Sequence, residues 1–296
     1  MSTPRLLQTL AASAALTLSA QAALDTNQIE SLTGLKGVWN EQEKVFKVSA
    51  PRTDIKISVD EWTMPPFMGL TSWAAFMDGK TEETMVMGDL VLFQDEVNPA
   101  MSAALGAGLK VTALHNHFFF DDPKVYFMHI EGEGSAEIMG GAVKKALAAS
   151  KEIRAANPQP AKSFGKALPK NNAISAAPIE AILGKGQSKD GMFKAVIGRK
   201  AKMPCGCEVT KEMGVNTWAA FAGIDDNAVV DGDFAVLESE LQGVLKSLRN
   251  SGVNIVAIHH HMIGEEPRTL FLHYWGRGKA VDLAKAVKAA LNTQSQ

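Results

Sequence analysis

Hydrophobic residues recur at two spacings along this chain, one typical of strands and one typical of helices. Residues 45–59 alternate between apolar and polar side chains, and residues 73–76 and 84–93 are mostly apolar, which predicts extended segments. Residues 135–149 place Ala, Leu and Lys at helical spacing, which predicts a helix. The same patterns return over residues 218–221, 228–237 and 279–293.

A further helix is predicted after the apolar strand in each half of the chain. Asp95 and Ser239 are good N-cap residues for its start, and Gln242 follows Ser239 at the spacing of a capping box. Gly108 and Gly252 are expected to end the two helices, because glycine readily adopts the left-handed conformation found at many helix ends.

The chain contains an internal repeat with an offset of 144 residues. Matching pairs include Gly88 and Gly232, Gly108 and Gly252, Pro123 and Pro267, and Gly134 and Gly278. Between the copies lies a stretch rich in Pro, Ala, Lys and Asn, which is typical of a linker. We therefore expect a first repeat domain over 24–150, a linker over 151–177 and a second repeat domain over 178–293.

The expected fold class is α+β. Each copy is predicted to be an antiparallel sheet packed with two helices, in the order strand, strand, helix, hairpin, helix. We expect the copies to be related by a pseudo-twofold axis, with their sheets meeting near the histidines.

Residues 1–22 resemble a signal peptide. Arg5 precedes an apolar run that ends in Ala20-Gln21-Ala22, the small-residue pattern read by signal peptidase. No cysteine follows this run, and no later segment is long and apolar enough to span a bilayer. The sequence therefore predicts a periplasmic or secreted protein, soluble after removal of the signal peptide and without a transmembrane anchor.

The overall composition is that of a globular protein, with 46% hydrophobic residues, 21% charged residues and a formal net charge of −2. The absence of a basic excess argues against a nucleic-acid partner. Cys205 and Cys207 have no counterpart in the first half, so we interpret them as incidental or redox-labile, with soft-metal binding as the alternative.

All seven histidines lie in two short windows, residues 113–134 and 257–278. Side chains alternate along a strand, so His115 and His117 share one face about 6.6 Å apart. A hairpin register with His115 opposite His129 would bring three imidazoles together. The second window repeats the set at His259, His261 and His273. His260 has the opposite parity and is left out of the site.

Residues of the other parity are apolar and suit packing against helices, among them Leu114, Phe118 and Met128. The histidine face is therefore free for a ligand. Three imidazoles leave open coordination positions, as in a catalytic zinc site. We predict a divalent metal, with zinc favoured and copper, iron or nickel as alternatives. A metal-free polar cleft and purely structural histidines remain open.

The residues after the third histidine differ between the copies. Glu131 and Glu133 follow in the first, and Trp275 and Arg277 in the second. A carboxylate can act as a general base and an arginine can bind an anionic group, so we predict Glu131, Glu133 and Arg277 as catalytic residues. Trp275 is a candidate substrate contact. An exposed strand end and core packing are the alternatives for the glutamates and the tryptophan.

A repeated Gly-Asp pair contains two further candidates, Asp89 and Asp233. These carboxylates are candidate hydrogen-bond partners that orient ligating imidazoles. A backbone role in a turn or bulge is the alternative.

Several of these segments together resemble the LppY/LpqO family of exported bacterial proteins. They are GLTSWAAF, MVMGDLVLFQDEVNP, VTALHNHFFFDDPKVYFMHIEGEG and VAIHHHMIGEEPRTLFLHYWGRG. The resemblance implies a two-copy architecture and export, and it supplies no reaction. The lipobox cysteine of the family's lipoprotein members is absent here, which argues against membrane anchoring.

The sequence thus predicts an exported metal-binding protein. We favour a metal-dependent hydrolase of a small or cell-envelope molecule, in which the metal activates water. The alternatives are a non-catalytic periplasmic carrier of copper or zinc and a metal-free module for an anionic ligand. Because Glu131 lies beside the first cluster and Arg277 beside the second, the first cluster is expected to bind metal more tightly.

Overall fold

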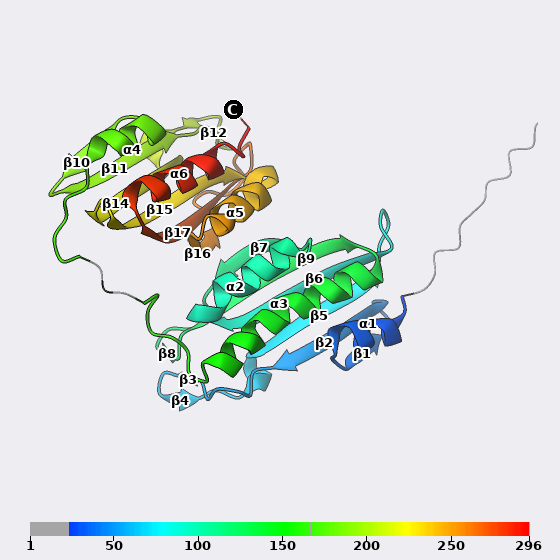
Figure 1. The fold of residues 1–296 in the computed structure, drawn as a ribbon. Coiled ribbons are helices and arrows are strands. Elements are labelled where there is room, and N and C mark those ends of the chain that lie inside the picture. Colours follow the sequence, from blue (N-terminus) through cyan, green and yellow to red (C-terminus); the bar gives the residue numbers. More distant parts are fainter. Residues whose placement is uncertain (1–23, 166, 168, 296) are drawn as a thin grey trace, which may run out of the picture.

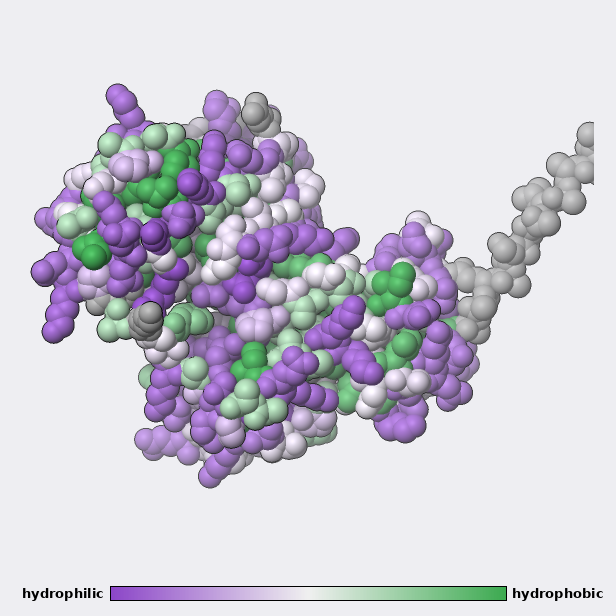
Figure 2. Space-filling model, in the orientation of Figure 1, coloured by the Kyte–Doolittle hydropathy of each residue, from purple (hydrophilic) through white to green (hydrophobic). Residues whose placement is uncertain are grey.

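The computed structural model describes residues 24–165, 167 and 169–295. The predicted signal peptide, residues 1–22, lies outside the described residues. No helix within the described ranges has both the length and the apolar character needed to cross a membrane. Most of the surface visible in Figure 2 is hydrophilic, with smaller apolar groups between the polar side chains.

The described residues form one twelve-stranded antiparallel sheet whose strand order repeats in reverse across its centre (Figure 1). From the edge to the centre, the first half contributes β1 (Gly37–Asn40), β2 (Val45–Pro51), β5 (Thr71–Asp78), β6 (Thr84–Phe93), β9 (Val125–Gly134) and β7 (Lys110–His115). From the centre outward, the second half contributes β16 (Asn254–His259), β17 (Thr269–Gly278), β15 (Asn227–Leu237), β14 (Asn216–Ile224), β11 (Met192–Gly198) and β10 (Gly186–Lys189). Both halves have the predicted order of elements.

Short elements complete each half. They are β3 (Ser58–Val59), β4 (Trp62–Thr63), β8 (Asp121–Asp122), β12 (Ala201–Lys202) and β13 (Glu208–Val209), with 3-10 turns η1 (Pro66–Met68), η2 (Lys211–Met213) and η3 (Glu238–Glu240). The extended segment predicted over 45–59 is therefore divided. It breaks after Pro51 because Arg52 turns inward to a buried carboxylate.

Six helices occur in the described residues. They are α1 (Thr26–Thr33), α2 (Gln94–Gly106), α3 (Ala136–Ala156), α4 (Ala176–Leu183), α5 (Leu241–Asn250) and α6 (Ala280–Leu291). Helices α2 and α3 cover strands of the first half, and α5 and α6 cover strands of the second (Figure 1). The prediction of two helices per half missed α1 and α4, which have only eight residues each. Helix α3 also continues to Ala156, inside the predicted linker.

The starts of α2 and α5 differ from the prediction. Asp95 lies in the first turn of α2, and Ser239 lies in the turn η3 before α5. Instead, Glu96 and Glu240 make the side-chain hydrogen bonds at these helix starts. Each accepts from the backbone N–H three residues earlier, at 2.9 and 3.0 Å. The predicted N-caps were wrong because Phe93 and Leu237 occupy the N-cap positions, and the two glutamates bind their backbone N–H groups.

Both of these glutamates are paired with arginines. Arg52 Nη1 lies 2.6 Å from Glu96, and Arg199 Nη1 lies 2.5 Å from Glu240. Each arginine also donates to a backbone carbonyl of the strand that leads into the helix, at 2.9 Å in the first half and 3.4 Å in the second. Arg52 thus joins the segment after β2 to the start of α2, and Arg199 joins the segment after β11 to the start of the helix in the second half. The sequence patterns did not reveal these two ion pairs.

The ion pair of Glu240 should make stability depend on pH. Burial alone would raise the pKa of this carboxyl, but hydrogen bonds from Arg199, Ser295 and the Leu237 amide outweigh it and lower the pKa to about 2. The folded-state pKa lies below the unfolded value, so the contribution is complete above about pH 4.5 and is lost as the pH falls toward 2. Glu240→Gln should therefore cost about 3 kcal/mol at pH 7 and progressively less below pH 4.5.

Urea unfolding of both proteins at pH 7, 4 and 3 measures this difference. A cost that stays constant over that range would contradict the lowered pKa of Glu240.

The two halves meet where β7 and β16 pair at the centre of the sheet. On one side, the side-chain amide of Asn98 on α2 accepts from the N–H of Ile255 and donates to its carbonyl, at 2.8 and 3.0 Å. On the other side, Gln242 on α5 does the same with Val111, at 3.0 and 2.9 Å. A single hydrophobic cluster contains buried residues of both halves. The copies are therefore packed as one body.

Candidate metal centre

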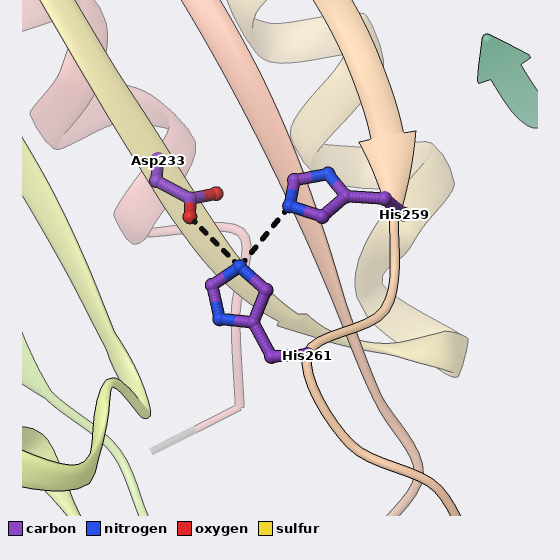
Figure 3. A group of neighbouring side chains, drawn as sticks. All are labelled: Asp233, His259 and His261. Carbon is purple, nitrogen blue, oxygen red and sulfur yellow. Dashed lines mark hydrogen bonds and ion pairs between the residues drawn. The ribbon is translucent and has the colours of Figure 1, made fainter.

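The candidate ligands of the second half come from three neighbouring strands and one loop. Asp233 lies on β15, opposite His273 on β17. His259 is the last residue of β16, and His261 lies in the loop that follows. Because β17 lies between β15 and β16, the side chains of Asp233 and His259 reach toward each other across that strand (Figure 3).

Three of these side chains converge. The Oδ2 atom of Asp233 lies 3.3 Å from Nε2 of His261, which lies 3.1 Å from Nε2 of His259 (Figure 3). One donor atom from each residue lies within 4.8 Å of the others. In a tetrahedral zinc site with bonds of about 2.0 Å, neighbouring donors are about 3.3 Å apart. Two of the three donor pairs have this spacing, and all three residues supply donor types that zinc binds.

Two polar atoms of the same group have no partner within the described residues. They are the second carboxylate oxygen of Asp233, Oδ1, and the Nδ1 atom of His259, and both are buried. Buried polar atoms are normally hydrogen-bonded. These two therefore keep hydrogen-bonding capacity that the protein itself does not use.

Burial shifts the acid–base behaviour of this site. Burial, followed by the nearby imidazoles of His273 and His261, lowers the pKa of His259 to about 4. Burial also raises the pKa of Asp233, against the opposite effect of the histidines. His259 is thus neutral near pH 7, which is the form that can donate a lone pair to a metal.

His273 does not lie where the sequence placed it. The predicted register was wrong, because Ala257 lies opposite His273 and Ala113 lies opposite His129. The connection between the first-half strands is also no tight turn, since residues 116–124 separate β7 from β9. His273 instead stacks on His259, with ring centroids 4.8 Å apart. Its Nδ1 atom lies 3.3 Å from the carbonyl oxygen of Gly232.

The first-half cluster is similar but converges less. The Nε2 atoms of His115 and His117 are 3.2 Å apart, and the rings of His115 and His129 stack with centroids 5.2 Å apart. Asp89 lies buried opposite His129, and this burial raises its pKa. Over the described residues, a converging group of three donors is found in the second half alone.

A phenylalanine supports one histidine of each cluster, and the sequence reasoning missed it. The ring of His117 stacks on Phe127 at 3.4 Å between centroids, and His261 stacks on Phe271 at 3.5 Å. Phe127 and Phe271 each lie two residues before the third histidine, so strand alternation places them on the histidine face. This spacing was the signal from which they could have been predicted. Phe118 was expected on the helix side but contacts Phe127 on the histidine side, at 5.9 Å. Its position was wrong because residue 118 lies beyond the end of β7.

The two acids predicted beside the first cluster are engaged elsewhere. The Oε1 atom of Glu131 lies 3.4 Å from the ammonium of Lys110. Glu133 is exposed and accepts a hydrogen bond from the Thr81 hydroxyl at 3.1 Å. Neither carboxylate is part of the converging donor group.

The two predicted residues of the second half lie farther along β17. Trp275 lines a cavity together with His273. Arg277 is half-buried and lies opposite Val229 on β15, two positions beyond Trp275. Of the two, Trp275 is the one placed next to a candidate ligand.

Cys205 and Cys207 lie apart from these residues in the sequence, in the loop between β12 and β13. Both are exposed free thiols. The same strand pair contacts the loop that precedes β17, through a bridge between Lys202 and Glu266.

Comparison with protein families gives two matches within this chain. The family model DUF1529, described as "Domain of Unknown Function (DUF1259)", matches residues 27–149 and again residues 177–293. The chain belongs to this family. The two matches show that the family's domain is present twice, as the internal repeat predicts.

Other comparisons add little. A search of the curated proteins finds no match. Among solved structures, a trimeric bacterial microcompartment shell protein PduB is 12% identical, with 87% of this chain and 89% of that chain covered and a TM-score of 0.23. A TM-score this low supports no conclusion about fold or function.

Proposed function

We propose that this chain is an exported metal-binding protein and that Asp233, His259 and His261 hold a divalent metal ion. The observation that carries the proposal is the convergence of one donor atom from each of these residues within 4.8 Å. Zinc is favoured, because two imidazoles and a carboxylate form a common donor set for it, and copper, iron and nickel are alternatives. Asp233, interpreted from the sequence as a partner of the ligands, is here a ligand itself.

The second cluster is proposed as the stronger site. The sequence favoured the first cluster because of Glu131 and Glu133, but these carboxylates are bound to Lys110 and Thr81. The first cluster also lacks a third converging donor among the described residues. We therefore assign weaker metal binding to His115, His117 and His129, with Asp89 beside them.

The reaction we favour is hydrolysis of a small or cell-envelope molecule. A divalent metal with three protein ligands has an open coordination position and supplies Lewis-acid chemistry there. His273 is the group placed to move a proton, and its Nδ1 atom lies 3.3 Å from the carbonyl oxygen of Gly232. Its ring stacks on His259 and also lines the adjoining cavity. Glu131, Glu133 and Arg277 have no role in this proposal.

A second candidate function is that of a metal carrier. His261 is exposed, and its side chain retains 35% of its accessible surface. A ligand at the surface favours exchange of the metal with solvent or with a partner. A carrier would release its metal readily to a chelator, whereas a hydrolase would retain it.

The architecture supports a symmetric relation between the copies. Leu114 and Ile258, which are 144 residues apart, lie directly opposite each other at the junction of β7 and β16. We infer a pseudo-twofold axis through this pair, with repeat domains over 24–150 and 178–293. The resemblance to the LppY/LpqO family and the pattern of residues 1–22 support export to the periplasm or beyond the cell.

Metal analysis of two double variants tests the site. Untagged protein should carry about one equivalent of zinc. His259→Ala with His261→Ala should reduce this to background, because it removes two of three ligands. The matched pair His115→Ala with His117→Ala should retain most of the metal.

The outcomes separate the assignments. Wild-type protein that binds no divalent metal at all would refute the metal proposal. Equal losses in the two double variants would refute the stronger role of the second cluster.

A further inference from the structure

A cavity of about 420 Å³ lies between the two halves, directly beside the second-half cluster. From the first half it is lined by α2, by Tyr126 of β9 and by Phe164 of the segment between the copies. From the second half it is lined by Asp231 of β15, by strand β16, and by His273 and Trp275 of β17. Its size lies within the range of small-molecule sites, about 300–1,000 Å³.

His273 connects this cavity to the proposed metal centre. It lies opposite Asp233 in the sheet and stacks on His259, and its ring also forms part of the cavity wall. A molecule in the cavity would therefore lie one side chain away from two of the proposed ligands.

The lining favours an aromatic ring. Trp275, Tyr126 and Phe164 supply three ring surfaces, and Val97, Ile255 and Val256 add aliphatic contacts. Aromatic rings stack on one another or meet edge to face, and the indole of tryptophan also attracts cations. A flat apolar group is thus the best match to these walls.

The charges of the lining favour a cation. Among the described residues that line the cavity, Asp231 is the one carboxylate, and none is a lysine or arginine. The side-chain amide of Asn98 is hydrogen-bonded to the backbone of Ile255, and the side-chain oxygen Oδ1 of Asn254 accepts from Arg249 at 3.0 Å. The Asn98 amide and the Asn254 side-chain oxygen are therefore already hydrogen-bonded, whereas Asp231 is exposed. An anionic ligand would meet this carboxylate without a compensating charge.

The equivalent cavity on the other side of the junction has a different character. It contains Lys110, Glu131, Glu238 and Arg268, and it adjoins His259. Glu131 occupies the position of Trp275, 144 residues earlier, and Met87 occupies that of Asp231. The aromatic lining is therefore a property of one copy and does not follow from the fold.

We propose that the cavity beside His273 binds a small aromatic amine, with its ring against Trp275 and its ammonium group at Asp231. Binding of the amine follows from the cavity alone. Its role as the substrate of the metal centre rests on the proposed function.

Isothermal titration calorimetry with three probes tests the charge preference. The probes are 2-phenylethylamine, 2-phenylethanol and 3-phenylpropanoate, which share a phenyl group and differ in charge. The amine should bind at least about tenfold more tightly than the carboxylate, with the alcohol between them, because one unit charge at Asp231 acts with opposite sign on the two ions. Equal affinities for the three probes, or a preference for the carboxylate, would overturn the proposal.

Three variants locate the binding. Asp231→Asn should weaken the amine about fivefold and leave the alcohol nearly unchanged. Trp275→Ala should weaken all ring-bearing probes by on the order of tenfold. Glu131→Gln, the matched change at the position equivalent to Trp275, should change none of them. Since Asp231 is exposed, its variant remains informative even if Trp275→Ala impairs folding.

Titration of metal-free and zinc-loaded protein separates this inference from the proposed function. Amine binding that depends on Asp231 in metal-free protein supports the cavity assignment whatever the metal content. Zinc binding without amine binding would refute the cavity assignment and leave the metal centre intact.

Discussion

Replacing Glu96 by Gln is expected to lower the free energy of unfolding by about 3–5 kcal/mol, because it removes the buried carboxylate that two buried arginines share and leaves them only the more exposed Asp54 and Asp95. Glu96 is 0% exposed and forms ion pairs with two arginines, Arg52 at 2.6 Å and Arg154 at 2.8 Å. The side chains of both arginines are more than nine-tenths buried. Asp95 also pairs with Arg154 and compensates part of the charge. Urea unfolding monitored by circular dichroism measures the loss.

A glutamate in a surface ion pair provides the control. Glu41 pairs with Lys44 while both side chains remain largely exposed. Glu41→Gln should change the stability by less than about 0.5 kcal/mol. If Glu96→Gln cost no more than this control, the buried network would not be a determinant of stability.

Gly232→Val should destabilise the second half by about 4 kcal/mol and weaken metal binding together with it. A Cβ atom at Gly232 would overlap the ring of Tyr274 and the carbonyl of Trp218. Tyr274 is completely buried and donates a hydrogen bond to that carbonyl at 2.9 Å, so it cannot move aside easily. The carbonyl oxygen of Gly232 also lies 3.3 Å from Nδ1 of His273, and Gly232 directly precedes Asp233 in the sequence. Calorimetric unfolding and zinc titration measure the two effects.

Gly141 in α3 is the matched control, because a Cβ there would meet no atom within 4 Å. Gly141→Val should change the stability by less than about 0.5 kcal/mol, since valine and glycine differ little in helix propensity. A Gly232→Val protein as stable as this control would show that the close approach of Tyr274 is not required.

The fold could be predicted from the sequence where local patterns decide it. Runs of apolar residues marked strands such as β6, and the offset of 144 residues revealed the duplicated domain. Helices α1 and α4 were missed because eight residues give too little periodicity. The ion pairs of Glu96 and Glu240 were missed because they join residues more than forty positions apart, which no local pattern reports.

The candidate site was predicted only in part, for a related reason. His259 and His261 are two residues apart in the sequence, so their proximity was predictable. Asp233 joins them because β15 and β16 flank the same strand, and strand order is a property of the whole sheet. The hairpin register depends on the conformation of the long connection and on irregular pairing in β7 and β16, which alternation alone cannot locate.

The paired amides of Asn98 and Gln242 have an evolutionary consequence. Each side chain binds the backbone of the other copy, which is the reciprocal form that two identical subunits adopt when they share an interface. An ancestor with one copy could therefore have assembled as a homodimer through this surface. In such a dimer, any substitution would alter both binding sites at once. Gene fusion would remove that restriction, and the two positions now differ, with Trp275 in one copy and Glu131 in the other.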